Sequence, residues 1–118
     1  MFVVIRRYAA GARASEVARR VGEGLVPILT KLSGFRAYYC LVGEDGRPVS
    51  VSIVESRDAA VVANDRAREW VAANMADLLP DPPEVTMGEM LVDAATFDED
   101  EEEKPDSKSE APWMDGGV

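Results

Sequence analysis

The order of secondary-structure patterns in the first 93 residues is the feature that most constrains how this chain can fold. Runs rich in β-branched and aromatic residues are typical of strands, and apolar residues that recur every three or four positions are typical of helices. Strand patterns cover residues 2–8, 35–42, 49–53 and 85–92, and helical patterns cover residues 15–32 and 56–78. The predicted order is therefore strand–helix–strand–strand–helix–strand.

Local signals mark where the two predicted helices begin and end. Ser15 and Ser56 are the expected N-cap residues, because a serine hydroxyl can accept a hydrogen bond from a first-turn amide. Gly34 is typical of a position just past a helix end. Pro27 lies inside the first helical pattern, where proline removes an amide and clashes with the carbonyl four residues earlier. We therefore expect a kink or a break there.

Four strands in this order predict an antiparallel sheet with both helices on one face, the α+β ferredoxin-like β-α-β-β-α-β fold. Asp45-Gly46 is a strong turn signal and predicts a hairpin between the second and third strands. We expect one domain over residues 1–95, since 118 residues leave room for only one core. The expected buried stripe of the second helix is Ala60, Ala63, Ala67, Trp70 or Val71, and Leu78.

The negative charge is concentrated in the last part of the chain. Residues 1–93 carry 11 Lys and Arg against 13 Asp and Glu, whereas residues 94–118 carry 2 against 9. The composition of residues 96–118 is typical of a disordered acidic tail. Trp113 and Met114 are the exceptions in that tail, and they predict either weak docking on the chain itself or a short motif for a partner. The nearly neutral domain predicts no nucleic-acid partner.

The predicted strands carry apolar side chains on both faces, although helices are expected on only one. Val3 and Ile5 alternate with Phe2 and Val4 in the first strand. A monomer seldom exposes a large apolar sheet face, and a second copy of the same face would cover it. We therefore expect a homodimer with an apolar pocket between the two sheets.

The absence of histidine excludes several kinds of chemistry. A chain with no histidine has no Ser-His-Asp or Cys-His site and no histidine-ligated haem. Cys40 is the only cysteine, which excludes an internal disulfide and a thiolate zinc cluster. We expect Cys40 to be a buried, inert thiol and expect neither a metal nor a cofactor.

The beginning of the chain does not resemble a targeting segment. Arg6 and Arg7 follow the first apolar run, the reverse of the order in a secretory signal peptide. Because no apolar stretch approaches the length of a membrane span, we expect a cytoplasmic protein without a membrane partner.

Four segments resemble the dimeric α/β-barrel superfamily, in particular its antibiotic-biosynthesis-monooxygenase-like proteins. They are Phe2–Tyr8, Ser33–Phe35, Val51–Ser56 and Trp70, and the resemblance covers residues 1 to about 93. It implies ferredoxin-like subunits and an activity like that of cofactor-independent oxygenases of aromatic polyketides or of oxidative haem-degrading enzymes.

The residues of the first strand and second helix separate these two activities. Haem-degrading members pair a first-strand asparagine with a helix tryptophan and a histidine iron ligand. Trp70 matches the tryptophan, but the first strand has Arg6 and Tyr8 and no asparagine, so we do not expect haem degradation. Polyketide oxygenases place asparagine, tryptophan, tyrosine and arginine around the substrate, and Asn64 completes that set of residue types here, at a different spacing.

The candidate substrate-binding residues come from three strands and the second helix. They are Arg6, Tyr8, Tyr39, Ser50, Ser52 and Trp70. Ser50 and Ser52 alternate with Val49, Val51 and Ile53, and we expect the apolar set to face the helices and the serines to face the dimer interior. Each candidate also has a structural interpretation: Trp70 as core, Arg6 as a sheet edge or an ion pair, and the serines as close sheet packing. No catalytic residue is assigned.

The leading hypothesis is a small homodimeric protein that resembles cofactor-independent monooxygenases and binds a small aromatic or apolar molecule between the sheets. Its chemistry would require a substrate that itself donates an electron to oxygen. The first alternative is a non-catalytic small-molecule-binding or regulatory dimerisation module. The second alternative is a structural dimeriser whose tail recruits a partner, and a tightly filled interior would favour it.

Overall fold

The structure is a computed structural model and describes residues 1–11 and 13–95. The acidic tail at residues 96–118, with Trp113 and Met114, lies outside the described residues. The predictions made for that segment stay predictions.

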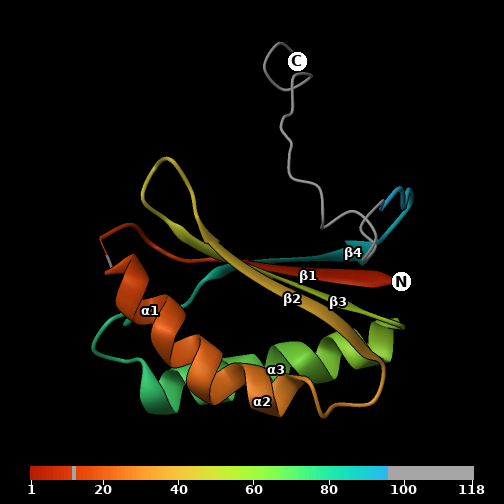
Figure 1. Cartoon of the computed structure of the whole chain (residues 1–118), viewed down its shortest axis with the longest axis horizontal. Coiled ribbons are helices and arrows are strands. Elements are labelled where there is room, and N and C mark those ends of the chain that lie inside the picture. Colours follow the sequence, from red (N-terminus) through yellow and green to blue (C-terminus); the bar gives the residue numbers. More distant parts are fainter. Residues whose placement is uncertain (12, 96–118) are drawn as a thin grey trace, which may run out of the picture.

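The described chain forms one four-stranded antiparallel sheet with its helices packed on one side. The elements, in chain order, are β1 (Phe2–Arg7), α1 (Ala14–Arg20), a π-helical segment η1 (Val21–Leu25), α2 (Val26–Leu29), β2 (Phe35–Val42), β3 (Pro48–Val54), α3 (Arg57–Asn74) and β4 (Glu84–Glu89). The strand order is β2-β3-β1-β4, and all neighbouring strands are antiparallel. Figure 1 shows the helices below the sheet and the upper face uncovered by any described helix. The ferredoxin-like prediction is confirmed.

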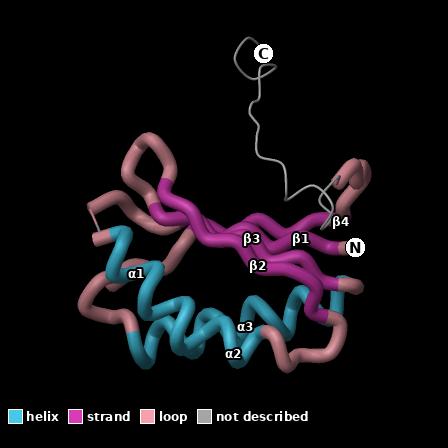
Figure 2. Tube along the Cα trace, viewed as in Figure 1, coloured by secondary structure: helices cyan, strands magenta, loops and turns pink. Residues whose placement is uncertain are grey.

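Strand register decides which side chains face the helices. Val4 of β1 lies opposite Ser52 of β3, and Arg6 lies opposite Ser50. All four of these residues are buried, with exposed fractions of 7% or less. In β2, Tyr38 pairs with Ser52 and therefore shares this face. The tube view places the helices against this single face of the sheet (Figure 2).

The predicted orientation of Ser50 and Ser52 is wrong. Both serines face the helices, and Val51 faces the opposite side with its neighbours at positions 49 and 53. A Ser–Val alternation normally turns its valines toward the core, but the centre of this helix-facing layer holds the polar side chains of Arg6 and Tyr8. Val49, Val51 and Ile53 therefore lie on the face that no described helix covers.

The first helical region continues through Pro27 without a break. The chain passes from α1 through the π-helical segment η1 into α2, where Pro27 lies in the first turn. A π-helical turn shifts the hydrogen-bonding pattern by one residue, and this relieves the conflict between a proline ring and the preceding turn. The irregularity thus occurs where the sequence predicts it, in a different form.

The predicted capping signals have mixed outcomes. Ser56 is the N-cap of α3, and its hydroxyl accepts a hydrogen bond from the amide of Ala59 at 3.1 Å, as predicted. Ser15 caps nothing, because α1 starts one residue earlier, after Arg13. Gly34 has a φ of +80°, a conformation that glycine adopts without strain, so the glycine signal is confirmed.

Close approach between the two helical regions depends on Gly24. Its position in η1 would place an added Cβ 2.4 Å from Cζ2 of Trp70 on α3. Trp70 is half-buried against the core, and the α3 stripe beside it is small and buried, as predicted: Ala60, Ala63, Ala67 and Val71. The prediction is wrong for Leu78, because α3 ends at Asn74 and Leu78 lies beyond it, only partly buried. The glycine lets the indole lie flat against the first helical region.

We predict that Gly24→Ala lowers the free energy of unfolding by about 1–3 kcal/mol, because the added methyl overpacks the contact with Trp70. Gly22→Ala is the matched control two residues away, where an added Cβ meets nothing within 4 Å. There the gain in helix propensity should stabilise the protein by about 0.5–1 kcal/mol. Urea denaturation measures both effects, and equal effects of the two variants would contradict this packing.

Candidate functional site

A cluster of polar side chains lies between the sheet and α3. Arg6 is 3% exposed and donates a hydrogen bond from Nε to the Tyr8 hydroxyl at 3.0 Å. Its Nη1 donates to Oδ1 of Asn64 on α3 at 2.5 Å. The guanidinium also lies 5.6 Å from the centre of the Tyr8 ring, within cation–π range. Arg6 therefore joins β1 to α3 through Asn64 and is held from its own side by Tyr8, and both partners are neutral.

The charge of Arg6 is not balanced by a neighbouring carboxylate. Within residues 1–11 and 13–95, no Asp or Glu oxygen lies within 4.0 Å of its guanidinium, whereas Arg19, Arg20, Arg36 and Arg47 all form ion pairs. Burying a cation without a counter-ion is unfavourable. A buried charge kept under these conditions is typical of a site that receives an anionic or electron-rich group.

A small internal cavity of about 20 Å³ adjoins this cluster. Arg6, Tyr8, Tyr38 and Ser50 supply its polar lining, and the rest comes from apolar side chains of the helices, from β2 and β3, and from Leu79. A volume of this size holds about one water molecule. An aromatic ligand would fit only if a neighbouring segment moved.

The cavity lies next to a larger groove that opens to the surface. The groove has a volume of about 320 Å³ and runs between α3, the loop after α3 and the start of β4. Arg6 and Leu79 line both the cavity and the groove. A second groove of about 250 Å³, lined by Tyr8, also reaches Leu79. Leu79, which is 7% exposed, therefore borders the cavity and both surface grooves.

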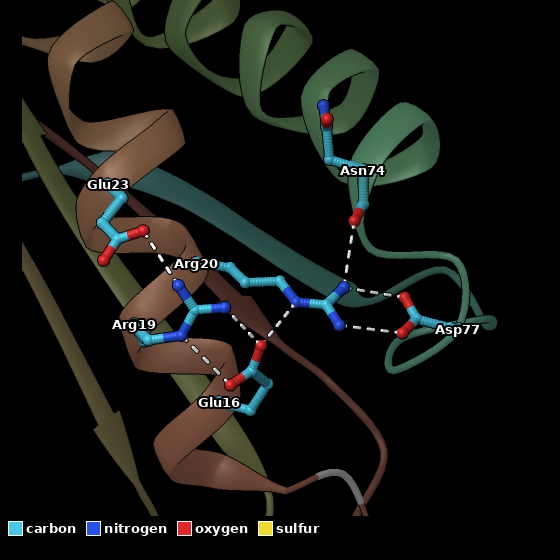
Figure 3. Close-up of polar contacts among 6 residues, drawn as sticks. All are labelled: Glu16, Arg19, Arg20, Glu23, Asn74 and Asp77. Atoms are coloured by element: carbon cyan, nitrogen blue, oxygen red, sulfur yellow. Dashed lines mark hydrogen bonds and ion pairs between the residues drawn. The ribbon is translucent and has the colours of Figure 1, made fainter.

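Ion pairs fix the loop that carries Leu79 (Figure 3). Both terminal nitrogens of Arg20 on α1 bind the Asp77 carboxylate, at 2.9 and 3.0 Å, and Nη1 also donates to the carbonyl of Asn74 at the end of α3. Nε of Arg20 donates to Glu16 at 2.9 Å. Hydrogen bonds from Arg19, and then from Arg20, lower the pKa of Glu16 to about 2, and Arg20 likewise lowers the pKa of Asp77.

The two tyrosines of the cluster are held as neutral phenols. Burial raises the pKa of Tyr8, an effect that the nearby Arg6 partly offsets. Burial also raises the pKa of Tyr38. Both hydroxyls therefore remain available as hydrogen-bond donors at neutral pH, next to a fixed positive charge. This combination can stabilise a negative charge on a ligand oxygen.

The structure brings four of the six predicted site residues together. Arg6, Tyr8, Ser50 and Ser52 share the helix-facing side of the sheet, whereas Tyr39 lies on the opposite face and is 53% exposed. Trp70 packs on Gly24 and does not line the cavity or the grooves. The roles proposed for these residues in binding stay predictions.

Three residues of the site were not in the predicted set. Asn64 is placed by helical spacing, since it lies four residues after Ala60 and three before Ala67, both buried. Tyr38 is placed by strand pairing with Ser52. Leu79 belongs to a loop and carries no periodic signal. The expectation of a buried Cys40 is wrong, because Cys40 lies on edge strand β2 and is exposed, although partial burial raises its pKa.

Within the described part of the chain, no group of three or more acidic or cysteine side chains could hold a metal ion. The same residues include no helix that is long and apolar enough to cross a bilayer.

Comparison with known proteins identifies the fold. No family profile matches the sequence, and no curated protein matches it. Solved structures do match. Rv0793 from Mycobacterium tuberculosis has a TM-score of 0.61 and 23% identity over 80% of this chain and 98% of its own. The monooxygenase of ActVA-Orf6 from Streptomyces coelicolor, in complex with nanaomycin D, has a TM-score of 0.62 and 21% identity over 83% and 92%. The fold is that of antibiotic-biosynthesis-monooxygenase-like proteins.

A variant of MhuD with two manganese protoporphyrin IX molecules per active site also shares the fold, at a TM-score of 0.62 and 19% identity over 81% of this chain and all of that one. The monooxygenase-like resemblance predicted from the sequence is thus confirmed for the fold. Because proteins with different ligands share the fold, the activity has to be argued from the site.

Proposed function

We propose that this protein is a homodimer in which each subunit binds a small aromatic molecule between its sheet and helices and oxygenates it without a cofactor. The supporting observation is the buried Arg6, held by Tyr8 and Asn64 with no carboxylate partner among residues 1–11 and 13–95. A solved monooxygenase with the same fold binds nanaomycin D, and this likeness also supports the proposal. The site lies on the helix side of the sheet because the polar groups gather there.

The substrate would supply the reducing power. A phenol or enol anion transfers an electron to O₂, and the protein holds the anion where donors and a positive charge already point. Arg6 and the neutral hydroxyl of Tyr8 would stabilise the oxyanion of the substrate. Entry would require displacement of Leu79, which is 7% exposed, since the cavity that it lines has a volume of only about 20 Å³.

We predict that the protein accelerates oxidation of anthrone to anthraquinone, with one O₂ consumed and one water released per molecule. Tyr8→Phe should slow the enzymatic rate by about 10²-fold or more, the usual cost of losing one donor to a developing oxyanion. Oxygen uptake and absorbance of the quinone measure the reaction.

Tyr39→Phe serves as the comparison variant, because Tyr39 lies on the opposite face of the sheet. On the proposed assignment only Tyr8→Phe slows the reaction. Loss of activity in Tyr39→Phe alone would place the site between two sheets and overturn the location proposed here. No acceleration by the wild-type protein would reject the oxygenase function for this substrate class.

A non-catalytic binding module is the second candidate. It is favoured by the lining of the internal cavity, which includes no carboxylate that could act as a base among the described residues. On this hypothesis anthrone binds and quenches tryptophan fluorescence, but oxygen uptake stays at the uncatalysed rate. A structural dimeriser is expected to have a tightly filled interior, and the cavity of about 20 Å³ agrees with that hypothesis. The groove of about 320 Å³ favours a protein that binds a small molecule.

The outer face of the sheet supports the homodimer. Apart from Arg7, which lies opposite Val49, its side chains from β1, β2 and β3 are apolar, and Tyr39 and Leu41 remain 53% and 50% exposed. No described helix covers them (Figure 1). An apolar face of this kind is typical of an interface, and a two-fold axis lets the same face of a second copy cover it.

We predict that the chain sediments at about twice its mass of 12.8 kDa. Val51→Glu, which puts a charge at the centre of the outer face, should convert the dimer into monomers, because an unpaired buried carboxylate is costly. Val62→Glu is the control, since Val62 is 42% exposed on α3, which packs against the other face of the sheet. A folded monomeric wild type, or a dimer that survives Val51→Glu with unchanged affinity, would contradict the proposal.

A further inference from the structure

The groove beside Arg6 has a charged inner end and apolar walls. Arg6 is buried at its base, and Val71, Leu79, Pro83 and Val85 contribute apolar surface. A volume of about 320 Å³ lies at the lower end of the range for small-molecule sites. The groove would therefore suit a flat molecule of one or two rings that has a polar group at one end.

The guanidinium of Arg6 has unused hydrogen-bonding capacity. An arginine has five N–H donors in a planar fork, and Arg6 makes two hydrogen bonds to the described residues, through Nε to Tyr8 and through Nη1 to Asn64. Both acceptors are neutral. Two parallel N–H groups at the end of such a fork match the two oxygens of a carboxylate, which a phenol oxygen cannot match.

The other charges of the groove lie nearer the solvent. Arg68 is 60% exposed and already forms an ion pair with Asp65 at 3.0 Å. Asp81 lines the groove and is exposed, so water and salt screen its repulsion of an anion. Arg6, in contrast, is buried, where a charge acts with little screening. Discrimination between anionic and neutral ligands therefore depends on Arg6, at the inner end of the groove.

We propose that the groove between α3 and β4 binds an aromatic carboxylate, with the carboxylate paired to the fork of Arg6 and the ring between Leu79 and Val85. This inference rests on the proposed binding of a small aromatic molecule and adds the chemical class of that molecule. The ligand supplies the counter-ion that Arg6 lacks among the described residues. Asn64 and Tyr8 hold the fork in place and are positioning residues for it.

The test compares three probes of similar shape: 2-naphthoate, 2-naphthamide and 2-naphthol. Calorimetric titration of the wild-type protein at neutral pH should give a dissociation constant for 2-naphthoate at least about tenfold lower than for the amide or the phenol. Arg6→Gln should remove this preference. Arg36→Gln, which removes an exposed arginine paired with Glu55 on the sheet edge, should preserve it.

Each outcome has one meaning. Equal affinity for the three probes, or an equal loss in Arg6→Gln and Arg36→Gln, overturns the carboxylate assignment and leaves the proposed binding of aromatic molecules standing. The oxidation of anthrone, which has no carboxylate, tests that broader proposal separately. Failure of 2-naphthoate to bind wild-type protein also overturns the carboxylate assignment.

A spectroscopic test does not depend on the folding of Arg6→Gln. In ¹⁵N-labelled wild-type protein, 2-naphthoate should shift the Nε–H resonance of Arg6 and leave that of Arg36 in place. 2-Naphthamide at the same occupancy should shift the Arg6 resonance much less. An unmoved Arg6 resonance under saturating 2-naphthoate would overturn the proposal.

Discussion

The buried guanidinium of Arg6 sets the arrangement of the layer between the sheet and α3. It ties β1 to α3 by a hydrogen bond to Asn64, it also donates to the hydroxyl of Tyr8, and no described carboxylate compensates its charge. Protein interiors seldom contain a cation without a counter-ion, because the free energy lost on removing the charge from water exceeds the free energy gained from neutral hydrogen bonds. The alanines of α3 and the serines of β3 are small enough to leave room for the arginine and two tyrosine rings.

The same polar centre explains why the sheet turns its most apolar side chains outward. With arginine, tyrosine and serine on the helix side, the valines and isoleucine of β3 occupy the face that the described helices leave open. The chain thus keeps its polar cluster between the sheet and the helices and places an apolar surface on the open face of the sheet. A second copy would protect that surface and leave the polar cluster of each subunit intact.

Local signals in the sequence are sufficient for the fold and insufficient for the site. Element order, the Ser56 cap and the alanine stripe of α3 follow from periodicity and short-range chemistry, and the structure contains all three. The periodicity of β3 shows that its serines and its apolar residues lie on opposite faces, but it cannot show which set faces the helices. That choice depends on the residues that the other elements contribute to each face. Leu79 closes the site from a loop, through contacts that only the packed chain creates.

Replacement of Arg6 by methionine tests the central claim that this charge is kept for a ligand and not for stability. Methionine is unbranched, flexible and uncharged, and it removes the burial cost together with the two hydrogen bonds. Urea denaturation of Arg6→Met should give a free energy of unfolding within about 1 kcal/mol of wild type or above it. A loss of more than about 3 kcal/mol would show that Arg6 is a structural element and would contradict this account.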